Sequence, residues 1–433
     1  MIEPELRTFV APDVPPDDVF NRCVRCGLCL PTCPTYVETL VETSGPRGRI
    51  ALIKNVAEGR LDVTSPGFMH QMSECLDCRA CEAVCPSGVE YGRILEPART
   101  QIQRAIAPAR SPGTRMLRGV LLGLFENLGW MRAVARLVRF AQRTGLESFA
   151  RRIGLVRALG LEDAMTLAPR ISDRFFVPSE QRWPAEGTRR ATAFIHAGCI
   201  MQVAFAEVDE ATVRMLQRAG CDVVAPRRQG CCGAITIHAG EMQRGRRLAR
   251  RTIAAFEASG ADVYVVNAAG CGSALKEYRL LLADDAGWAQ RAAAFSARVR
   301  DVSEWLDEIG IPGKPRSLER TVTYQEPCHL VHAQRIAGAP RRLLARIPGL
   351  RLLEMPESSV CCGSAGIYNL TQPRMAQRLG ARKARNILAV DAEVVVTANP
   401  GCALQVAAEL RRAGREIPVK HVVELLDEAY ARA

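Results

Sequence analysis

The sequence lacks the features of a secreted or membrane-spanning protein. Its first twenty residues, MIEPELRTFVAPDVPPDDVF, are acidic and broken by proline, without the basic and apolar regions of a secretory signal. No stretch reaches the roughly 18 consecutive apolar residues of a membrane-spanning helix. The best candidate, residues 116–140, carries five charged side chains. We therefore expect a cytoplasmic protein, or one bound peripherally to the inner face of the cytoplasmic membrane.

The sequence also lacks the glycine-rich loops that bind nucleotide cofactors. A strand–Gly-x-Gly-x-x-Gly–helix fingerprint and a Walker A loop are both missing. The run Gly45-Pro-Arg-Gly-Arg-Ile50 is basic but does not follow a predicted strand, so it is weak evidence for phosphate binding. Without its own flavin or nicotinamide site, the chain is expected to act as one subunit of a larger oxidoreductase.

Cysteine, in contrast, is abundant and unevenly placed. Seventeen cysteines in a reducing compartment indicate metal binding or redox chemistry and not a disulfide framework. Eight lie between Cys23 and Cys85, none follows until Cys199, and nine lie between Cys199 and Cys402. A chain of 433 residues is too long for one ordinary domain. We expect four parts: residues 1–98, 99–190, 191–312 and 313–433.

The first eight cysteines form two Cys-x2-Cys-x2-Cys-x3-Cys-Pro runs, which are typical of a two-cluster ferredoxin. Three closely spaced thiolates wrap three corners of a cubane, and the fourth, followed by proline, turns away to the other cluster. This predicts two [4Fe–4S] clusters in a mainly helical domain. Structural zinc is the alternative, but it leaves the third cysteine and the proline unexplained. The predicted ligands are Cys23, Cys26, Cys29 and Cys85 for cluster 1, and Cys75, Cys78, Cys81 and Cys33 for cluster 2.

The last region is an internal repeat of alternating strands and helices. Corresponding cysteines are offset by 129, 130, 130 and 131 residues, and each copy closes with a similar helix, at residues 302–308 and 422–428. The pattern predicts two α/β units related by a pseudo-twofold axis. The cysteines follow strands or precede helices, and in open α/β sheets that edge is where sites form.

Each copy carries four cysteines around a Cys-Cys-Gly motif, whose glycine allows the backbone to bend between adjacent thiols. Three interpretations of each set remain open: a four-thiolate cluster, an unoccupied site, or buried structural thiols. Under the first interpretation, the repeats would hold one or two further iron–sulfur clusters. Cys221 lies outside the pattern and is expected in the core. The two sets are Cys199, Cys231, Cys232 and Cys271, and Cys328, Cys361, Cys362 and Cys402.

Most histidines flank these cysteine loops. His238 and His332 are candidates for handling protons near a cluster, because histidine titrates near neutral pH. His196 is expected to be an ordinary hydrogen-bonded polar residue.

The middle region, residues 99–190, is helical by periodicity and strongly basic. It carries 17 arginines against 7 acidic side chains, a surplus of ten. Two interpretations are open: a surface for anionic lipid, or a solvated face that docks acidic partner subunits. No recognition-helix or aromatic-interleaved pattern indicates nucleic acid.

The C-terminal repeat resembles the cysteine-rich repeat of heterodisulfide reductases, which supplies five cysteines to a non-cubane cluster. This chain departs from that pattern, because Ala268 and Asn399 stand where the family has a fifth cysteine.

The whole order of motifs resembles the iron–sulfur subunit of bacterial glycolate oxidase, also called glycolate dehydrogenase, almost from end to end. The residues that carry this resemblance are Gly45-Pro-Arg-Gly-Arg-Ile50, Cys81 to Cys85 with Pro86-Ser-Gly88, Gly230-Cys-Cys-Gly-Ala234, Gly270-Cys-Gly272 with Lys276-Glu-Tyr278, His332-Ala-Gln334, Cys361-Cys-Gly-Ser-Ala-Gly366, and Val396-Thr-Ala-Asn399 with Gly401-Cys402.

The resemblance implies an electron-transfer subunit that works with other proteins. Its partners would be an FAD-binding subunit that oxidises glycolate to glyoxylate and a second flavoprotein-like subunit, with a membrane quinone as acceptor. Related complexes keep the same motifs but oxidise lactate or glycerol 3-phosphate, or act on a thiol–disulfide couple. A zinc- or thiol-based scaffold or redox sensor is the non-enzymatic alternative.

Overall fold

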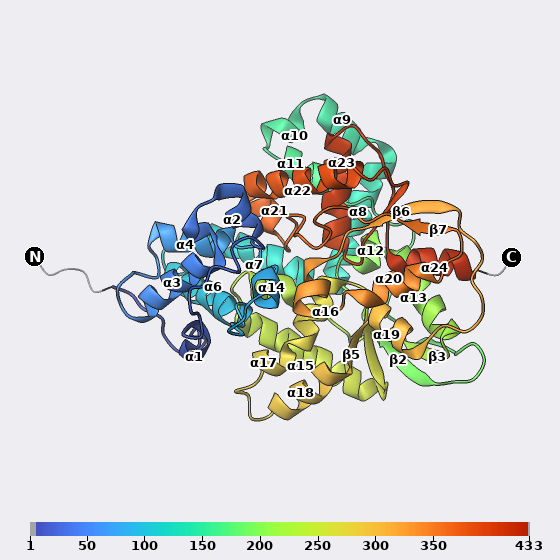
Figure 1. Cartoon of the computed structure of the whole chain (residues 1–433), viewed down its shortest axis with the longest axis horizontal. Helices are drawn as coiled ribbons and strands as arrows, with labels where there is room; N and C mark the ends of the chain where they lie inside the picture. The colour runs from blue at the N-terminus through green and yellow to red at the C-terminus, as the bar shows by residue number, and fades with distance from the viewer. Residues whose placement is uncertain (1–5, 432–433) are drawn as a thin grey trace, which may run out of the picture.

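The computed structural model describes residues 6–431, which form an N-terminal helical module, a helical linker and two α/β repeats (Figure 1). The N-terminal module lies at one end of the molecule, and the linker crosses the two repeats. This arrangement agrees with the fold class expected from the sequence. Among residues 6–431, no helix combines the length and hydrophobicity needed to cross a bilayer.

The N-terminal module consists of short helices separated by the cysteine loops. Pro34, Pro46 and Pro66 each stand in the first turn of a helix, where proline leaves no N–H unpaired. The helices enclose a small apolar core that includes Ile53 and Phe68. They are α1 (Asp17–Phe20), α2 (Pro34–Thr39), α3 (Pro46–Ala57), α4 (Pro66–Glu74), α5 (Ala80–Ala83) and α6 (Gly92–Ile106), with a 3-10 turn at Glu42–Ser44. The boundary expected at residue 98 falls inside α6.

The linker begins with two capped helices and packs on both repeats. The side chains of Ser111 and Asn127 accept hydrogen bonds from the first backbone N–H groups of α7 and α8. Helix α7 contacts α14, α8 contacts α12, and α11 contacts α23. The linker helices are α7 (Pro112–Glu126), α8 (Leu128–Thr144), α9 (Leu146–Arg152), α10 (Leu155–Ala158) and α11 (Glu162–Leu167).

The end of the expected helical region is not helical. Residues 168–190 contain three prolines, Pro169, Pro178 and Pro184, which break helical hydrogen bonding. In place of a helix, the short strand β1 (Arg182–Trp183) pairs antiparallel with β3 of the first repeat. The connecting segment therefore ends as an edge of the first sheet.

The two repeats contain sheets with the same order of four parallel strands, and the first sheet has β1 as an additional edge strand. The first sheet runs β1-β3-β2-β4-β5 and the second β7-β6-β8-β9, with all pairs parallel except β1–β3. The first repeat comprises β2 (Ala191–Ile195), α12 (Met201–Ala204), α13 (Ala206–Arg218), β3 (Cys221–Val224), α14 (Ala234–His238), α15 (Met242–Ser259), β4 (Val263–Val266), α16 (Ala269–Lys276), α17 (Tyr278–Leu281), α18 (Ala289–Arg298), β5 (Val299–Asp301) and α19 (Val302–Ile309). The second comprises β6 (Arg320–Tyr324), the π-helical turn η2 (His329–Ala333), α20 (Gly338–Ala345), β7 (Leu350–Leu352), α21 (Tyr368–Thr371), α22 (Pro373–Leu388), β8 (Val394–Val396), α23 (Pro400–Arg412), β9 (Val419–Lys420) and α24 (Val422–Tyr430).

The closing helices of the repeats are exchanged. Helix α24 of the second repeat packs on α13 of the first, and α19 of the first packs on α20 of the second. Matching ion pairs accompany the exchange: Arg214–Asp427 at 2.7 Å and Arg342–Asp307 at 2.5 Å. One continuous apolar core spans both sheets, so the repeats fold as one body with pseudo-twofold symmetry.

A buried arginine joins the N-terminal module to the first repeat. The side chain of Arg79 is 4% exposed, and it pairs with Asp77 at 2.7 Å, Glu82 at 3.2 Å, Glu96 at 3.4 Å and Glu277 at 3.2 Å. We call this group of five residues the Arg79 cluster. Glu277 follows α16, so the cluster ties the second cysteine loop to the first repeat.

Replacing Gly92 with alanine should disrupt the Arg79 cluster. A Cβ atom at Gly92 would lie 1.7 Å from the guanidinium carbon of Arg79, so the buried side chain would have to move. Displacing one partner of a buried charge pair costs about 3 kcal/mol or more. We expect this loss in anaerobic guanidinium unfolding followed by tryptophan fluorescence.

Gly67→Ala is the matched control, because a Cβ there meets no atom within 4 Å. Its effect should stay within about 1 kcal/mol. Equal unfolding midpoints for the two variants would contradict a structural role for the Arg79 cluster.

Candidate functional site

The cysteines predicted for cluster 1 line one small hollow. Cys23, Cys26, Cys29 and Cys85 all face it, beside Arg47. The backbone N–H of Val89 donates to the sulfur of Cys85 at 3.4 Å, and burial raises the pKa of Cys29 to about 11. The structure therefore brings this predicted set together, including the distant Cys85.

The cysteines predicted for cluster 2 lie deeper in the N-terminal module. Burial raises the pKa of Cys81 well above its usual range, and the nearby charges of Cys78, Cys75 and Cys33 add to the effect. Cys33 stands at the start of α2 and lies 3.3 Å from the hydroxyl of Thr35. The second set thus also includes the cysteine from the other run.

The two cysteine loops bend at equivalent positions. In the first loop Arg25 and Gly27 have φ values of 59° and 85°, and in the second Asp77 and Arg79 have values of 54° and 59°. Left-handed backbone between closely spaced cysteines turns successive thiols toward a common centre. The second loop holds this conformation without glycine, because Asp77 and Arg79 are fixed by the Arg79 cluster.

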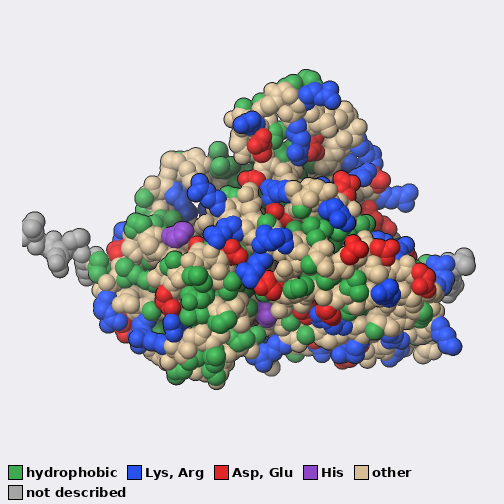
Figure 2. Space-filling view, turned by 45° about the horizontal axis from the view of Figure 1, so that its top comes forward, with side chains coloured by type: hydrophobic (Ala, Val, Ile, Leu, Met, Phe, Trp, Pro, Cys, Tyr) green, Lys and Arg blue, Asp and Glu red, His purple; other side chains and the backbone are tan. Residues whose placement is uncertain are grey.

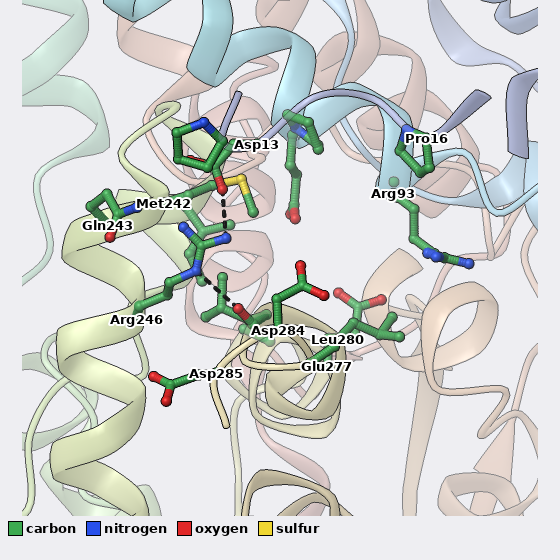
Figure 3. Close-up of a pocket in the computed structure, with 18 of the residues that line it drawn as sticks. Asp13, Pro16, Arg93, Met242, Gln243, Arg246, Glu277, Leu280, Asp284 and Asp285 are labelled. Carbon is green, nitrogen blue, oxygen red and sulfur yellow. Dashed lines mark hydrogen bonds and ion pairs between the residues drawn. The ribbon is translucent and has the colours of Figure 1, made fainter. Parts of the chain in front are cut away.

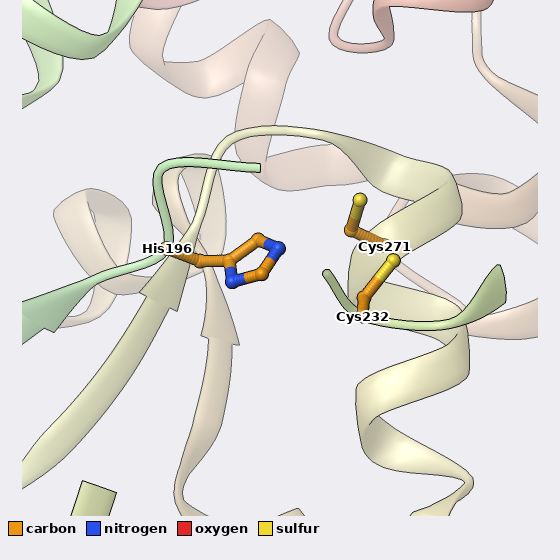
Figure 4. Close-up of side chains that lie close together, drawn as sticks. All are labelled: His196, Cys232 and Cys271. Carbon is orange, nitrogen blue, oxygen red and sulfur yellow. The ribbon is translucent and has the colours of Figure 1, made fainter. Parts of the chain in front are cut away.

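The first repeat gathers its four cysteines at the carboxyl ends of its strands. Cys199 follows β2, Cys231 and Cys232 follow β3, and Cys271 lies on α16 after β4. The sulfur atoms of Cys232 and Cys271 and one ring nitrogen of His196 lie within 4.8 Å of one another. Figure 4 shows the ring of His196 turned toward the two cysteines. The neighbouring thiol of Cys232 and then His196 lower the pKa of Cys271 to about 6, against the effect of burial.

His196 was expected to be an ordinary satisfied residue, and the structure shows otherwise. Its Nδ1 atom lies 2.7 Å from the hydroxyl of Tyr264, but its buried Nε2 atom has no hydrogen-bond partner among the described residues. The position of His196 directly after β2 and three residues before Cys199 was the available signal in the sequence. His196 belongs to the first repeat site.

The second repeat gathers an equivalent set with different neighbours. Cys361 interacts with Cys328 and Cys362, and Cys362 interacts in turn with Cys402. The side-chain amide of Asn399 donates to the sulfur of Cys402 at 3.4 Å. Lys383, 2% exposed, lies close enough to the thiols for their charges to act on its pKa, although burial lowers that pKa overall.

The second repeat site adjoins the cysteines of cluster 2. Burial is the largest cause of the raised pKa of Cys78, and the charge of Cys328 is the next largest. Both cysteines pack against the same small apolar cluster, and the hydroxyl of Tyr368 donates to the backbone oxygen of Glu74 at 2.8 Å. Among the described residues, the second repeat site therefore lies next to the second cysteine loop through its own Cys328.

The two histidines predicted to handle protons occupy different surroundings. His238 stacks on His329 with ring centres 5.5 Å apart, and its Nδ1 atom lies 3.2 Å from Asp77 and 3.1 Å from Glu96. Burial would lower the pKa of His238, but these carboxylates outweigh it and raise the pKa to about 9. Burial lowers the pKa of His332, whose Nε2 atom lies 3.0 Å from the backbone oxygen of Ser359. Their proton-handling role stays a prediction.

The donor sets fit iron–sulfur clusters. All seventeen cysteines are free of disulfides, and sixteen of them fall into four groups of four. Thiolate groups of this number, partly hydrogen-bonded by N–H donors, are the ligands of cubane clusters. Cys221, the remaining cysteine, is fully buried on β3 and accepts a hydrogen bond from Trp305, as expected for a core residue. The fold and sites together define an iron–sulfur electron-transfer protein.

Family models match each part of the chain. A 4Fe-4S dicluster domain model matches residues 19–89, and a cysteine-rich domain model matches residues 193–276 and 322–407. The linker region of the glycolate oxidase iron-sulfur subunit matches residues 113–166.

Curated relatives identify the family. The chain is 41% identical to a probable glycolate oxidase iron-sulfur subunit of Bacillus subtilis, over 94% of this chain and 93% of that one. It is 34% identical to the glycolate oxidase iron-sulfur subunit of Escherichia coli, over 95% of each chain. Lactate utilization protein A of Oceanobacillus iheyensis is 29% identical over 53% of this chain and 93% of its own. The chain belongs to the glycolate oxidase iron–sulfur subunit family.

The crossing cysteines provide a direct test of the predicted ligand sets. With four irons per cubane, Cys85→Ser should lose about four irons and deprive Cys23, Cys26 and Cys29 of their partner. Cys33→Ser should do the same to the second set. Iron and sulfide analysis with electron paramagnetic resonance of anaerobic protein measures both losses.

Cys221→Ser is the matched control, since it removes a buried thiol outside the four groups and should keep the full iron content. About eight irons per wild-type chain would indicate that the repeat sites are empty, whereas twelve to sixteen irons would indicate that they hold clusters. Zinc in place of iron would contradict the assignment altogether.

Proposed function

We propose that this protein is the electron-transfer subunit of a flavin-dependent complex that oxidises glycolate to glyoxylate. The observation that carries the proposal is the similarity along nearly the whole chain, linker included, to glycolate oxidase iron-sulfur subunits. Partners would be an FAD-binding subunit and a second flavoprotein-like subunit, with a membrane quinone as acceptor.

Lactate is the less supported donor. The similarity to lactate utilization protein A covers only 53% of this chain, although it covers 93% of that relative. Almost half of the chain therefore has no counterpart there. Glycerol 3-phosphate and a thiol–disulfide couple remain as alternative donors, because cysteine ligands do not report the substrate.

The arrangement of sites supports a linear order of electron carriers. Iron–sulfur clusters, when bound, accept and release single electrons. Cys81, predicted for the second set, lines the hollow of the first set, and Cys78 lies near Cys328 of the second repeat. These neighbours support an electron path from the first set through the second set to the second repeat site.

Glycolate should reduce the clusters when the protein is in complex with its flavoprotein partners. We expect the co-purified complex to show a bleached visible spectrum and a new paramagnetic signal after anaerobic addition of glycolate. Lactate and glycerol 3-phosphate, added separately, should give at least tenfold slower reduction.

Cys85→Ser serves as the internal control, because the flavin should still be reduced while the clusters of the variant receive fewer electrons. Faster reduction by glycerol 3-phosphate than by glycolate, or the absence of any flavoprotein partner, would contradict the proposal.

We further propose that the linker helices bind the surface of an anionic membrane. Of the 24 large hydrophobic side chains that are exposed in the described residues, 14 lie between Met116 and Leu161. Five arginines of the same stretch are exposed, whereas its two acidic residues, Glu126 and Glu147, are partly buried. Figure 2 shows hydrophobic and basic side chains, with some acidic ones between them, on the part that projects at the top. Apolar and arginine side chains mixed on short helices are typical of interfacial binding.

The double variant Leu137→Ser/Phe140→Ser should weaken membrane binding. These side chains are 71% and 61% exposed, so their loss removes apolar contact with lipid without opening the core. We expect salt-sensitive co-sedimentation of wild-type protein with phosphatidylglycerol vesicles and at least fivefold weaker co-sedimentation of the variant.

Leu370→Ser removes a side chain of similar exposure, 54%, outside the linker and should bind like the wild type. Wild-type protein that stays in solution with these vesicles at low salt would contradict the membrane surface and favour docking of an acidic subunit.

A further inference from the structure

Three side chains from different parts of the chain converge between the N-terminal module and the first repeat. Asp77 lies in the second cysteine loop, Glu96 on α6 and His238 at the end of α14. One carboxylate oxygen of each acidic residue and Nδ1 of His238 all lie within 4.8 Å of one another. No sequence motif predicts this group, because its members are separated by up to 161 residues in the sequence.

Two of the converging atoms lack a well-formed hydrogen bond. Oδ2 of Asp77 and Nδ1 of His238 are buried, and neither has a hydrogen-bond partner of proper geometry among the described residues. Asp77 is only 2% exposed, so water does not replace the missing partner easily. Oδ2 and Nδ1 are 3.2 Å apart, and Oε1 of Glu96 lies 3.1 Å from Nδ1. Separations near 3 Å are those of neighbouring ligands on one ion with bonds of about 2.1 Å.

The surroundings carry an excess of negative charge. The four carboxylates of the Arg79 cluster face the guanidinium of Arg79 and that of Arg99, which donates to the backbone oxygen of His238. Burial, together with the neighbouring carboxylates, raises the pKa of Glu277 to about 7 although Arg79 opposes the shift. A divalent cation bound at Nδ1 of His238 would take the place of the proton that the carboxylates of Asp77 and Glu96 favour there.

Two of the three converging side chains line a cavity. The cavity has a volume of about 680 Å³, and its lining includes Arg79, Glu96, His238 and Glu277. Figure 3 shows the cavity, where Arg246 pairs with Asp13 and the carboxylates of Glu277 and Asp284 point into the space. An ion in this cavity would therefore meet Glu96 and His238 first, and would lose bound water on reaching the buried Oδ2 atom of Asp77.

We propose that Asp77, Glu96 and His238 form a binding site for one divalent transition-metal ion that links the N-terminal module to the first repeat. One imidazole and two carboxylates are borderline-hard ligands that suit Zn²⁺, Mn²⁺ or Fe²⁺. Because His238 comes from the repeat and the two carboxylates from the N-terminal module, the ion fixes the two parts against each other. The site is separate from the sixteen grouped cysteines and does not depend on the substrate of the complex.

Mn²⁺ is the probe that tests the site. Anaerobic full-length protein with oxidised clusters is washed with EDTA and titrated with Mn²⁺ alone, and the free ion is followed by electron paramagnetic resonance. We expect one Mn²⁺ per chain, displaced by an equivalent of Zn²⁺, and a higher midpoint of guanidinium unfolding with the ion bound. Glu96→Gln and His238→Gln should each weaken binding at least tenfold and remove this stabilisation.

His332→Gln is the matched control, since it removes a partly buried histidine outside the converging group, whose Nε2 atom lies near the backbone oxygen of Ser359, and it should bind Mn²⁺ within twofold of the wild type. The iron content of every variant reports whether it has folded with its clusters. Wild-type protein without stoichiometric Mn²⁺ binding would mean that protons balance the charges and would overturn the proposal. Unchanged binding in both Glu96→Gln and His238→Gln would overturn it as well.

Discussion

The guanidinium of Arg79, buried among four carboxylates, is the interaction on which the rest of the molecule depends. Removing an arginine from water is costly and is repaid only when several partners surround it. Here the partners come from the second cysteine loop, α6 and the first repeat, so the charge is satisfied only when all three are in place. The same side chain holds a left-handed backbone residue, φ 59°, between Cys78 and Cys81.

This constraint explains why the separate cysteine sites lie next to one another. The second loop is fixed on one side by Glu277 of the first repeat and lies against Cys328 of the second on the other. Parallel strands end at the same edge of each sheet, so the repeat cysteines collect there without long loops. The sites therefore sit close together because the N-terminal module is inserted where both sheet edges meet it.

Much of this architecture follows from local patterns in the sequence. The spacing of the cysteines and the alternation of strands and helices predict the elements of both repeats and the four groups of cysteines. The convergence of Asp77 with Glu96 and His238 could not be predicted, because packing between modules creates it and no periodicity records it. The role of His196 was missed for a similar reason: the sequence places it beside a cysteine but does not reveal which side of the ring meets Tyr264. The non-helical end of the linker could have been anticipated from its three prolines.

The exchange of α19 and α24 makes the two repeats an internal counterpart of a symmetric dimer. In a true homodimer every substitution appears at both sites, so the sites cannot diverge. Duplication within a single chain removes that restriction while keeping the shared core. One site has acquired His196 and Tyr264, and the other Lys383 and Asn399, around otherwise equivalent cysteines. The two cysteine sites are thus free to differ in their surroundings, and any clusters bound there would differ in their affinity for electrons.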